Sequence, residues 1–478
     1  MKKYILSGII ILSFSQNSFS QKTWTLQECV DYALQHNIQI KQGEISTEIS
    51  DNAQTQSLLG MFPSLNGSAS HSYNFGRSVD PFSYEFTTRK VSSSNLSLNA
   101  NVVLFNGFQL QNELKQSRLN YMSGKYDLDK IKNDVSLNVA AAYLQVLYAQ
   151  EQLNAQNDRV DIAKKQKDRT KILTDAGTLP QGSFLDAEAQ FATEELTKVN
   201  AENLLNNSYL SLIQLLELDS AGNFAVEKPK YAIPDQGSLS ITPADIYSVS
   251  LTTQPEIKSA EYKLQSAEKG LAIARGARFP RLSMFGSLST GYSNQSQRKK
   301  TLGGDYIDSY ATDYFVPTII DTFIVFAPLY SSPTYEDTPF SDQLEDNFNK
   351  AFGFNLSIPV FNGWATNTSV KRSKLNYENA KYSFELTKNS LFKSIQQAHA
   401  DAIASLKKYH AAEKNVSALN EAFSYTEKKF TAGLLTSLDY TTARNNLTKA
   451  ESDKLQAKYD LIFRLKVLDF YMGKPLVY

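Results

Sequence analysis

The sequence is poor in residues that carry metal or redox chemistry. It has one cysteine, Cys29, and four histidines, His36, His71, His399 and His410, among 478 residues. A single cysteine cannot form an internal disulfide, which excludes disulfide scaffolds, CxxC redox sites and zinc fingers. The histidines are scattered, and the sequence contains no HExxH, Walker loop, GxGxxG or GxSxG pattern. We therefore expect no catalytic residue, no metal site and no cofactor, and a protein that is not an enzyme.

The sequence also lacks a charge excess and a long apolar run. Lys and Arg total 49, and Asp and Glu total 49. A nucleic-acid-binding protein normally shows a basic excess, so we expect no nucleic-acid partner. No run of 18 apolar residues occurs, which argues against a helical membrane span.

The first 20 residues have the pattern of a signal peptide. Lys2 and Lys3 are followed by an apolar stretch, 4–14, and Ser18-Phe19-Ser20 fits the small-x-small cleavage pattern. A buried first helix is the alternative. We expect residues 1–20 to be removed, leaving Gln21 as the first residue. No lipid is expected there, because the residue directly after the cleavage point is not a cysteine.

A duplication is visible without any other sequence. Phe105-Asn106-Gly107 recurs as Phe361-Asn362-Gly363, and 70 residues after each glycine comes a second one, Gly177 or Gly433. Neither interval contains proline, and only Gly124 interrupts the first. A helix of about 70 residues is about 105 Å long, several times the usual length. Two equal rods of this kind indicate a tube more than a catalytic domain.

Each half shows the same predicted order: a helix, two strands, a long helix and a closing helix. We place the first half at 21–225, an equatorial linker at 226–240 and the second half at 241–478. The expected helices are 25–61, 107–176 and 181–217 in the first half, and 242–278, 363–432 and 436–472 in the second. The junctions between strands and helices are marked by Pro63, Asn106, Gly107, Pro280, Asn362 and Gly363.

The second half carries 39 extra residues, which lie around 296–350. This insertion is rich in tyrosine and aspartate and contains Pro317, Pro328, Pro333 and Pro339. Such a composition predicts a long loop outside regular structure.

The helical prediction rests on apolar residues that step by three and four. They form seams of the coiled-coil type, with polar residues on most other faces. The seams are Leu128, Ile131, Val135, Val139, Ala142 and Val146, and Ala457, Leu461, Leu465, Leu468 and Met472. The spacing predicts a layered wall of antiparallel helices, and an elongated soluble coiled coil is the alternative.

The predicted strands alternate between polar and apolar residues within two hairpins, 64–105 and 281–361. Their polar positions are mostly Ser and Asn, as in Ser64, Asn66, Ser68 and Ser70. About ten residues with one apolar side suit a barrel wall between lipid and water, and a soluble sandwich is the alternative. Four strands cannot close a barrel, and open edges in lipid leave backbone groups unsatisfied. We therefore expect a homo-oligomer, with at least three chains for a conducting pore.

Taken together, these features resemble the TolC family of outer-membrane efflux proteins. The resemblance spans 21–478 and is carried by the opening 26–34 with Asn37, the Phe-Pro and Phe-Asn-Gly junctions, and the segments 176–180 and 430–433. It implies a mainly α chain with a small β part. Three chains would form a long antiparallel α-helical barrel plus a shared transmembrane β-barrel, with four strands per chain and twelve in the trimer.

The resemblance also assigns candidate sites. Asp439 matches an aspartate that narrows the periplasmic entrance in the family. In the first half Ser183 occupies the spacing of Asp439, and the candidate Asp186 comes three residues later. Thr442 stands where a second aspartate would be. For Asp439 and Asp186 the alternative is a carboxylate near a helix N-terminus that interacts with the helix dipole. The helix tips, expected to have positive φ or close backbone approach at their glycines, would contact an adaptor through Gly177, Thr178, Leu179, Pro180, Gly433, Leu434 and Leu435.

The resemblance implies an outer-membrane efflux channel with a periplasmic extension in a Gram-negative cell. It would be a homotrimer in outer-membrane lipid, a passive exit duct for small molecules or drugs. A periplasmic adaptor protein would couple it to an inner-membrane RND or ABC transporter. The channel of type I protein secretion is an alternative, and a non-pore periplasmic coiled-coil scaffold is an alternative of another class.

Overall fold

The computed structural model describes residues 23–79, 84, 86–87, 90–218, 224–229, 241–301, 303–304, 306–318 and 320–474. The expected signal peptide, 1–20, lies outside these residues, as does the part of the expected linker at 230–240.

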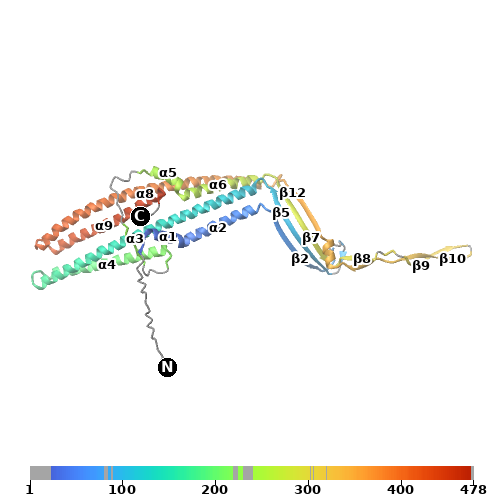
Figure 1. Cartoon of the computed structure of the whole chain (residues 1–478), viewed down its shortest axis with the longest axis horizontal. Coiled ribbons are helices and arrows are strands. Elements are labelled where there is room, and N and C mark those ends of the chain that lie inside the picture. The colour runs from blue at the N-terminus through green and yellow to red at the C-terminus, as the bar shows by residue number, and fades with distance from the viewer. Residues whose placement is uncertain are drawn as a thin grey trace, which may run out of the picture. The chain divides into compact units, whose positions relative to one another are not determined.

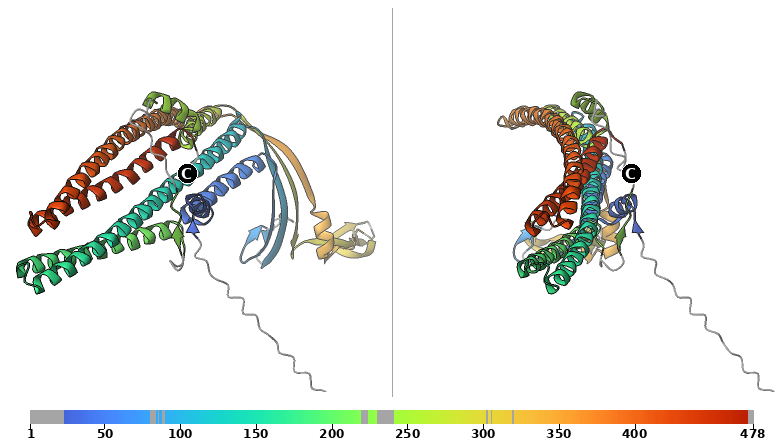
Figure 2. Two further views of the ribbon diagram at one scale, coloured as in Figure 1. Left: turned by 60° about the vertical axis from the view of Figure 1, so that its left-hand side comes forward. Right: turned by 90° about the vertical axis from the view of Figure 1, so that its left-hand side faces the viewer.

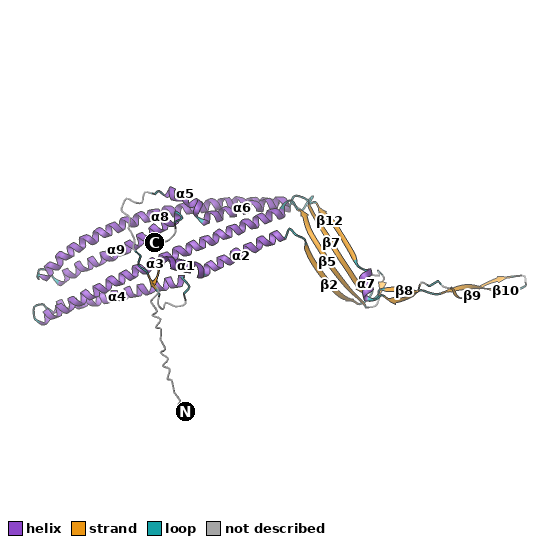
Figure 3. Cartoon of the chain, in the orientation of Figure 1, coloured by secondary structure: helices purple, strands orange, loops and turns teal. Residues whose placement is uncertain are grey.

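The two halves have helices of equal length in the same order (Figures 1 and 3). Helices α3 and α8 have 67 residues each, and α4 and α9 have 35 each. Shorter helices open each half, with 11 residues in α1 and α5 and 22 in α2 and α6. The bounds are α1 Leu26–His36, α2 Ile38–Leu59, α3 Gln109–Asp175 and α4 Gln181–Leu215, then α5 Pro243–Thr253, α6 Pro255–Gly276, α8 Ala365–Thr431 and α9 Ser437–Tyr471. The predicted duplication and rod lengths are confirmed.

One prediction about the helices is wrong. The stretches 25–61 and 242–278 are each broken into two helices, at Asn37 and Gln254. Asn37 is extended (φ −61°, ψ 129°), and its side-chain oxygen accepts from the Gln39 N–H at 2.9 Å, so it begins the next helix. Gln254 is also extended because Pro255 follows and disfavours helical geometry before it.

The chain divides into two compact units, 1–52 with 118–267 and 376–478, and 53–117 with 268–375. In the first unit, α4 runs back along α3 and α9 back along α8 (Figure 2). The predicted seams are buried there: Val139, Val146, Ala457 and Leu461 are each 0% exposed. Around the first seam, α1, α3 and α4 share one apolar cluster, so local 3.6-residue periodicity determines this packing.

The second unit is built on a four-stranded antiparallel sheet (Figure 3). Its strands are β2 Ser64–Asn74, β5 Val91–Phe105, β7 Arg281–Ser293 and β12 Asn349–Ser357, in the order β12-β7-β5-β2. The two hairpins therefore join through β5 and β7. The outer edges of β2 and β12 have no strand partner among the described residues.

The pairing register puts serine and asparagine on one face of this sheet. The Ser68 hydroxyl lies 2.7 Å from that of Ser97, which is aligned with Ser289 on β7. On the other face Val102, Met284 and Phe354 are aligned across three strands, and Met284 and Phe354 are exposed. The alternation predicted from the sequence is confirmed, and other large side chains of the apolar face, such as Leu65 and Phe352, are exposed as well.

The last strand is shorter than predicted. The hairpin 281–361 ends its regular structure at Ser357, and 358–361 are not strand. Pro359 has no backbone N–H and cannot continue the hydrogen-bond ladder. Apolar side chains also occur on the polar face. Val103 and Phe285 lie there, and the Phe285 ring packs where a Cβ on Gly353 would stand.

The insertion 296–350 is ordered, which corrects the prediction of a loop outside regular structure. It contains β8 Gln297–Thr301, β9 Tyr306–Pro317, β10 Thr322–Tyr330, β11 Thr334–Asp337 and the helix α7 Phe340–Asp346. β8 pairs with β11 and β9 with β10. A two-stranded ribbon has two edges, and edges tolerate proline, so Pro317 and Pro328 are compatible with strands.

Short pairs complete the topology: β1 Thr23–Trp24 with β6 Ala225–Val226, and β3 Ser78–Val79 with β4 Phe86–Thr87. β6 lies at the start of the expected linker 226–240. Among the described helices, none is both long enough and apolar enough to cross a membrane.

Candidate functional site

The turn after α3 ends that helix by a defined hydrogen-bond pattern. Gly177 has φ +74°. Its N–H donates to the Thr174 carbonyl at 2.9 Å, and the Thr178 N–H donates to the Leu173 carbonyl at 2.9 Å. This pair of bonds is a Schellman motif, which requires a left-handed residue at the position of Gly177.

The turn after α8 repeats this geometry. Gly433 also has φ +74°, and N–H groups of Gly433 and Leu434 donate to Phe430 and Lys429 at 3.0 and 2.9 Å. The positive φ predicted for both glycines is thus confirmed. Close backbone approach is not found, because a Cβ at either glycine would meet nothing within 4 Å. We call the two turns, 176–180 and 432–436, the tips.

The second tip carries a capped helix. The Asp439 carboxylate accepts from the Thr436 N–H and hydroxyl at 3.2 and 2.6 Å, and the Asp439 N–H donates to the same hydroxyl at 3.2 Å. These bonds lower the pKa of Asp439 from its ordinary 3.8. Asp439 is exposed and stays ionised at neutral pH. The spacing Thr436-x-x-Asp439 is a capping box that the sequence itself displays.

The first tip is built differently. α4 begins after Pro180, which makes no side-chain cap. Asp186 is exposed and lies in the second turn of α4. Leu179 is half-buried, whereas Thr178 is exposed. The second tip presents an apolar side chain instead, since Leu434 is 74% exposed and Leu435 is half-buried.

Further along the helices from the tips, a buried polar network joins α3, α4 and α9. Arg159 on α3 is 5% exposed and donates to the Thr448 carbonyl at 2.9 Å and to Glu451 at 3.3 Å, both on α9. Its neighbour Gln156 donates to the buried carboxylate of Glu194 on α4 at 2.6 Å. This network could not be predicted from the sequence, because its members lie far apart along the chain.

The strand-to-helix junction of the first half is closely packed. Gly107 has φ +66°, and a Cβ there would stand 2.3 Å from the Gly276 carbonyl oxygen. Gly276 is equally confined, since its own Cβ would stand 2.6 Å from the Gly107 oxygen. The sequence marked Gly107 but not Gly276, which lacks a motif of its own. The Asn106 side-chain oxygen accepts from the Leu110 N–H at 3.4 Å and caps α3.

The equivalent junction of the second half is open. Gly363 has φ +60°, and nothing lies within 4 Å of a Cβ placed there. Asn362 donates to the Thr366 hydroxyl at the start of α8. Pro63 and Pro280 each precede the first residue of a strand. Exposed aromatic side chains gather around these junctions: Phe62, Phe108, Phe279, Phe361 and Trp364.

No group of three or more His, Cys, Asp or Glu side chains in the described part of the chain is arranged to hold a metal ion. The candidate functional features of the described residues are therefore structural. They are two helical tips, a close-packed junction between strand and helix, and a sheet with one exposed apolar face.

Comparison with known proteins agrees with this geometry. The family model for the outer membrane efflux protein matches residues 29–217 and 329–474. Outer membrane protein TolC of Escherichia coli (strain K12) is 21% identical over 471 residues, covering 97% of this chain and 84% of that protein. Outer membrane protein TolC of Vibrio cholerae is 23% identical over 340 residues, covering 70% and 67%. The solved structure of CusC aligns with a TM-score of 0.75 at 16% identity, covering 94% of this chain and 92% of that one.

The fold and these matches define a channel of the bacterial outer membrane and not an enzyme. The chain belongs to the outer membrane efflux protein family. It is an outer-membrane efflux channel of a Gram-negative cell, as the resemblance to the TolC family predicted. Channels of this type are trimeric and work with adaptor proteins and inner-membrane pumps.

Proposed function

We propose that three copies of this chain form the passive exit duct of a tripartite efflux system. The observation that carries the proposal is the sheet of the second unit. Its apolar face is uncovered, and its two edge strands, β2 and β12, have no partner in the described chain. In lipid every backbone group at an edge must be paired. Joining β2 of one copy to β12 of the next satisfies both edges and closes twelve strands.

The polar face of the sheet then lines a water-filled path across the hydrocarbon. Its serine and asparagine side chains are uncharged, so they offer water hydrogen bonds without fixing ions. The exposed aromatic residues at the junctions, such as Phe279 and Trp364, suit the boundary between lipid and water. The pump supplies the energy for export, because in this proposal the chain forms a passive channel and catalyses no reaction.

The tips are proposed to meet the periplasmic adaptor. Residues 177–180 and 433–435 form the two turns, and Leu434 offers an exposed apolar contact. Asp186 and Asp439 are proposed to line the periplasmic entrance, since each lies early in a helix that starts at a tip. The pump is proposed to be of the RND or ABC class.

Small molecules are the proposed cargo. Outer membrane efflux protein BepC of Brucella suis matches 96% of this chain, whereas alkaline protease secretion protein AprF of Pseudomonas aeruginosa matches 27%. Toxin and drug export protein A of Aggregatibacter actinomycetemcomitans matches 91% of this chain, so protein secretion stays the alternative.

Conductance tests the duct directly. Purified full-length protein in planar bilayers should give discrete single-channel currents and should migrate as a heat-resistant trimer from the outer-membrane fraction. A soluble periplasmic monomer would support the scaffold instead. Protein that inserts yet carries no current under any opening condition would overturn the duct.

A further inference from the structure

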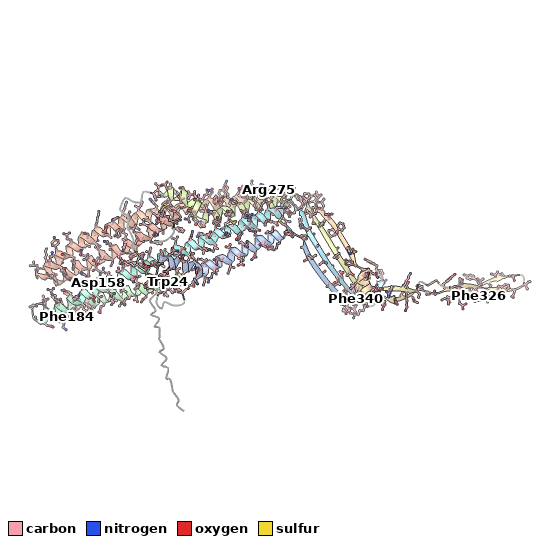
Figure 4. The ribbon with its side chains drawn as sticks, viewed as in Figure 1. Trp24, Asp158, Phe184, Arg275, Phe326 and Phe340 are labelled. Atoms are coloured by element: carbon pink, nitrogen blue, oxygen red, sulfur yellow. The ribbon has the colours of Figure 1, made fainter. Side chains whose placement is uncertain are left out.

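The insertion of the second half forms an arm at the end of the sheet away from the helices. β7 begins beside Pro280 at a helix junction and ends at Ser293, and the arm follows from there through β8. Its outer part is the ribbon of β9 and β10, residues 306–330, in which Phe326 lies (Figure 4). In an outer-membrane channel with periplasmic helices, this end of the sheet faces the outside of the cell.

The base of the arm is held firmly on the sheet. Gln343 on α7 is 2% exposed; it accepts from the Ser293 N–H at 2.9 Å and donates to the Ser293 carbonyl at 3.0 Å. These are the bonds that a strand would make, so α7 takes over the edge of β7 beyond the end of β12. Arg298 also bridges Glu336 and Asp342 at 2.9 and 2.8 Å. The starting point of the ribbon is therefore fixed at the rim of the sheet.

The ribbon itself is apolar on both faces. The register aligns Tyr310 with Ala327 and Val316 with Phe323 on one face, here called face A. Opposite lies face B, where Phe315 is aligned with Ile324 and Ala311 with Phe326. The large side chains of both faces are exposed: Tyr310, Val316, Phe323 and Leu329 on face A, and Phe315, Ile324 and Phe326 on face B.

An isolated two-stranded hairpin is marginal in water, and exposed apolar patches of this kind mark contact surfaces. A lipid surface or a single partner protein would cover one face and leave the other exposed. A threefold assembly gives every copy two neighbours, which matches two apolar faces. A contact of face A with face B of the next copy closes after three copies.

We propose that the ribbons of the three chains pack against one another, face A on face B, over the outer end of the barrel. The proposal rests on the trimer of the proposed function. The barrel holds the three bases close together, so the ribbons meet at an effective concentration on the order of millimolar. This effective concentration compensates for repulsion among like charges. No Lys or Arg lies between Lys300 and Lys350, whereas the ribbon contains Asp308, Asp313 and Asp321.

Cysteine cross-linking tests this packing with little disturbance. Ala311 on face B and Ala327 on face A are small residues at the middle of the ribbon. The native thiol gives little background, because Cys29 is 0% exposed and burial, with the nearby Glu28 charge, raises its pKa to about 12. The double variant Ala311→Cys/Ala327→Cys in a Cys29→Ala background should give covalent trimers with a short bismaleimide, and each single variant should lose them.

The controls separate this inference from the trimer itself. Heat-resistant trimer, measured without cross-linker, reports on the barrel alone. Intact trimers whose two cysteines react with a maleimide dye but never link chains would overturn the ribbon packing and leave the duct standing. A third outcome is that the cysteines do not link chains, and that the maleimide dye reaches them in detergent but not in lipid vesicles. This outcome would indicate that the ribbon contacts a lipid surface, and it would also overturn the ribbon packing.

Charge provides a second readout. Salt screens the repulsion between aspartates on facing ribbons, so the yield of covalent trimer should rise from low to high ionic strength. A yield that falls with salt would mean that attraction between opposite charges holds the ribbon in place. The ribbon has no Lys or Arg, so this result would contradict packing of one ribbon on another.

Discussion

Single glycines at the tips and at one junction have different physical requirements. Gly177 and Gly433 need only the left-handed backbone, because a side chain there would meet open space. Gly107 needs both the left-handed backbone and the missing Cβ, since the Gly276 oxygen fills that place. The same residue type therefore acts through conformation at one end of the long helix and through contact at the other.

Replacing a tip glycine should affect export without affecting insertion. Gly177→Val forces a side chain into the left-handed region, at a cost of about 1–2 kcal/mol, and should distort the turn offered to the adaptor. Efflux in cells should fall while outer-membrane levels stay normal. Gly182→Val is the control, because Gly182 lies within α4 with open space around it. Failure of Gly177→Val to insert would contradict the tip assignment.

The two junction glycines allow strain and collision to be measured separately. Gly107 and Gly363 have φ of +66° and +60°, so an alanine at either costs about 1–2 kcal/mol for its backbone alone. Gly107→Ala must in addition displace the Gly276 backbone. We expect heat-resistant trimer to be lost in Gly107→Ala and retained in Gly363→Ala. Equal behaviour of the two variants would show that the close approach does not matter.

The capping box at the second tip makes the start of α9 sensitive to acid. The Thr436 hydrogen bonds lower the pKa of Asp439, so their stabilisation is present above its ordinary value of 3.8 and is lost as pH falls through the lower folded value. The protection factors for hydrogen exchange at the first turn of α9, which are corrected for the intrinsic exchange rate at each pH, should therefore fall below about pH 4. Asp439→Asn should lack this acid-dependent step; an identical profile in the variant would refute the assignment.

At the scale of elements, the coiled-coil seams and the polar network hold the helices together by different means. The seams are apolar and local in sequence, and they pack α3 with α1 and α4. The network is polar and spans α3, α4 and α9, with Arg159 at its centre. A buried guanidinium of this kind specifies which helices face one another, because its donors need matching acceptors.

Removing Arg159 should loosen the contact between the two helical hairpins. Arg159→Ala removes the donor to the Gln156 side-chain oxygen and the bonds across to Thr448 and Glu451 on α9. Hydrogen bonds to a charged group contribute about 2 kcal/mol. The midpoint of thermal unfolding should drop clearly. Arg169→Ala is the matched control, because Arg169 lies on the same helix and is exposed. A comparable drop in the control would show that general charge, and not the network, is responsible.

At the scale of the whole molecule, one chain is incomplete. Its sheet has unpaired edges in β2 and β12, and its apolar face and aromatic junctions have no cover in the described chain. Lipid and the other copies provide both. The same logic extends to the ribbon 306–330, whose two exposed faces need two neighbours.

Much of this architecture could be predicted because its causes are local. Helix lengths follow from Pro-free intervals between glycines, the seams from spacings of three and four, and the sheet faces from alternation in segments such as 95–104. The insertion could not be predicted in this way. Its prolines and aspartates are typical of loops, and only pairing of β9 with β10 shows that a ribbon edge accommodates them.

By itself the sequence determined the duplicated order of elements, the rod lengths and the polar and apolar faces, because backbone periodicity and proline chemistry act within a few residues. Only the tertiary structure decided that Gly276 must be glycine, that Arg159 and Gln156 together join three helices and that Gln343 completes the edge of β7. Those requirements come from partners distant in the chain, and no local pattern encodes them.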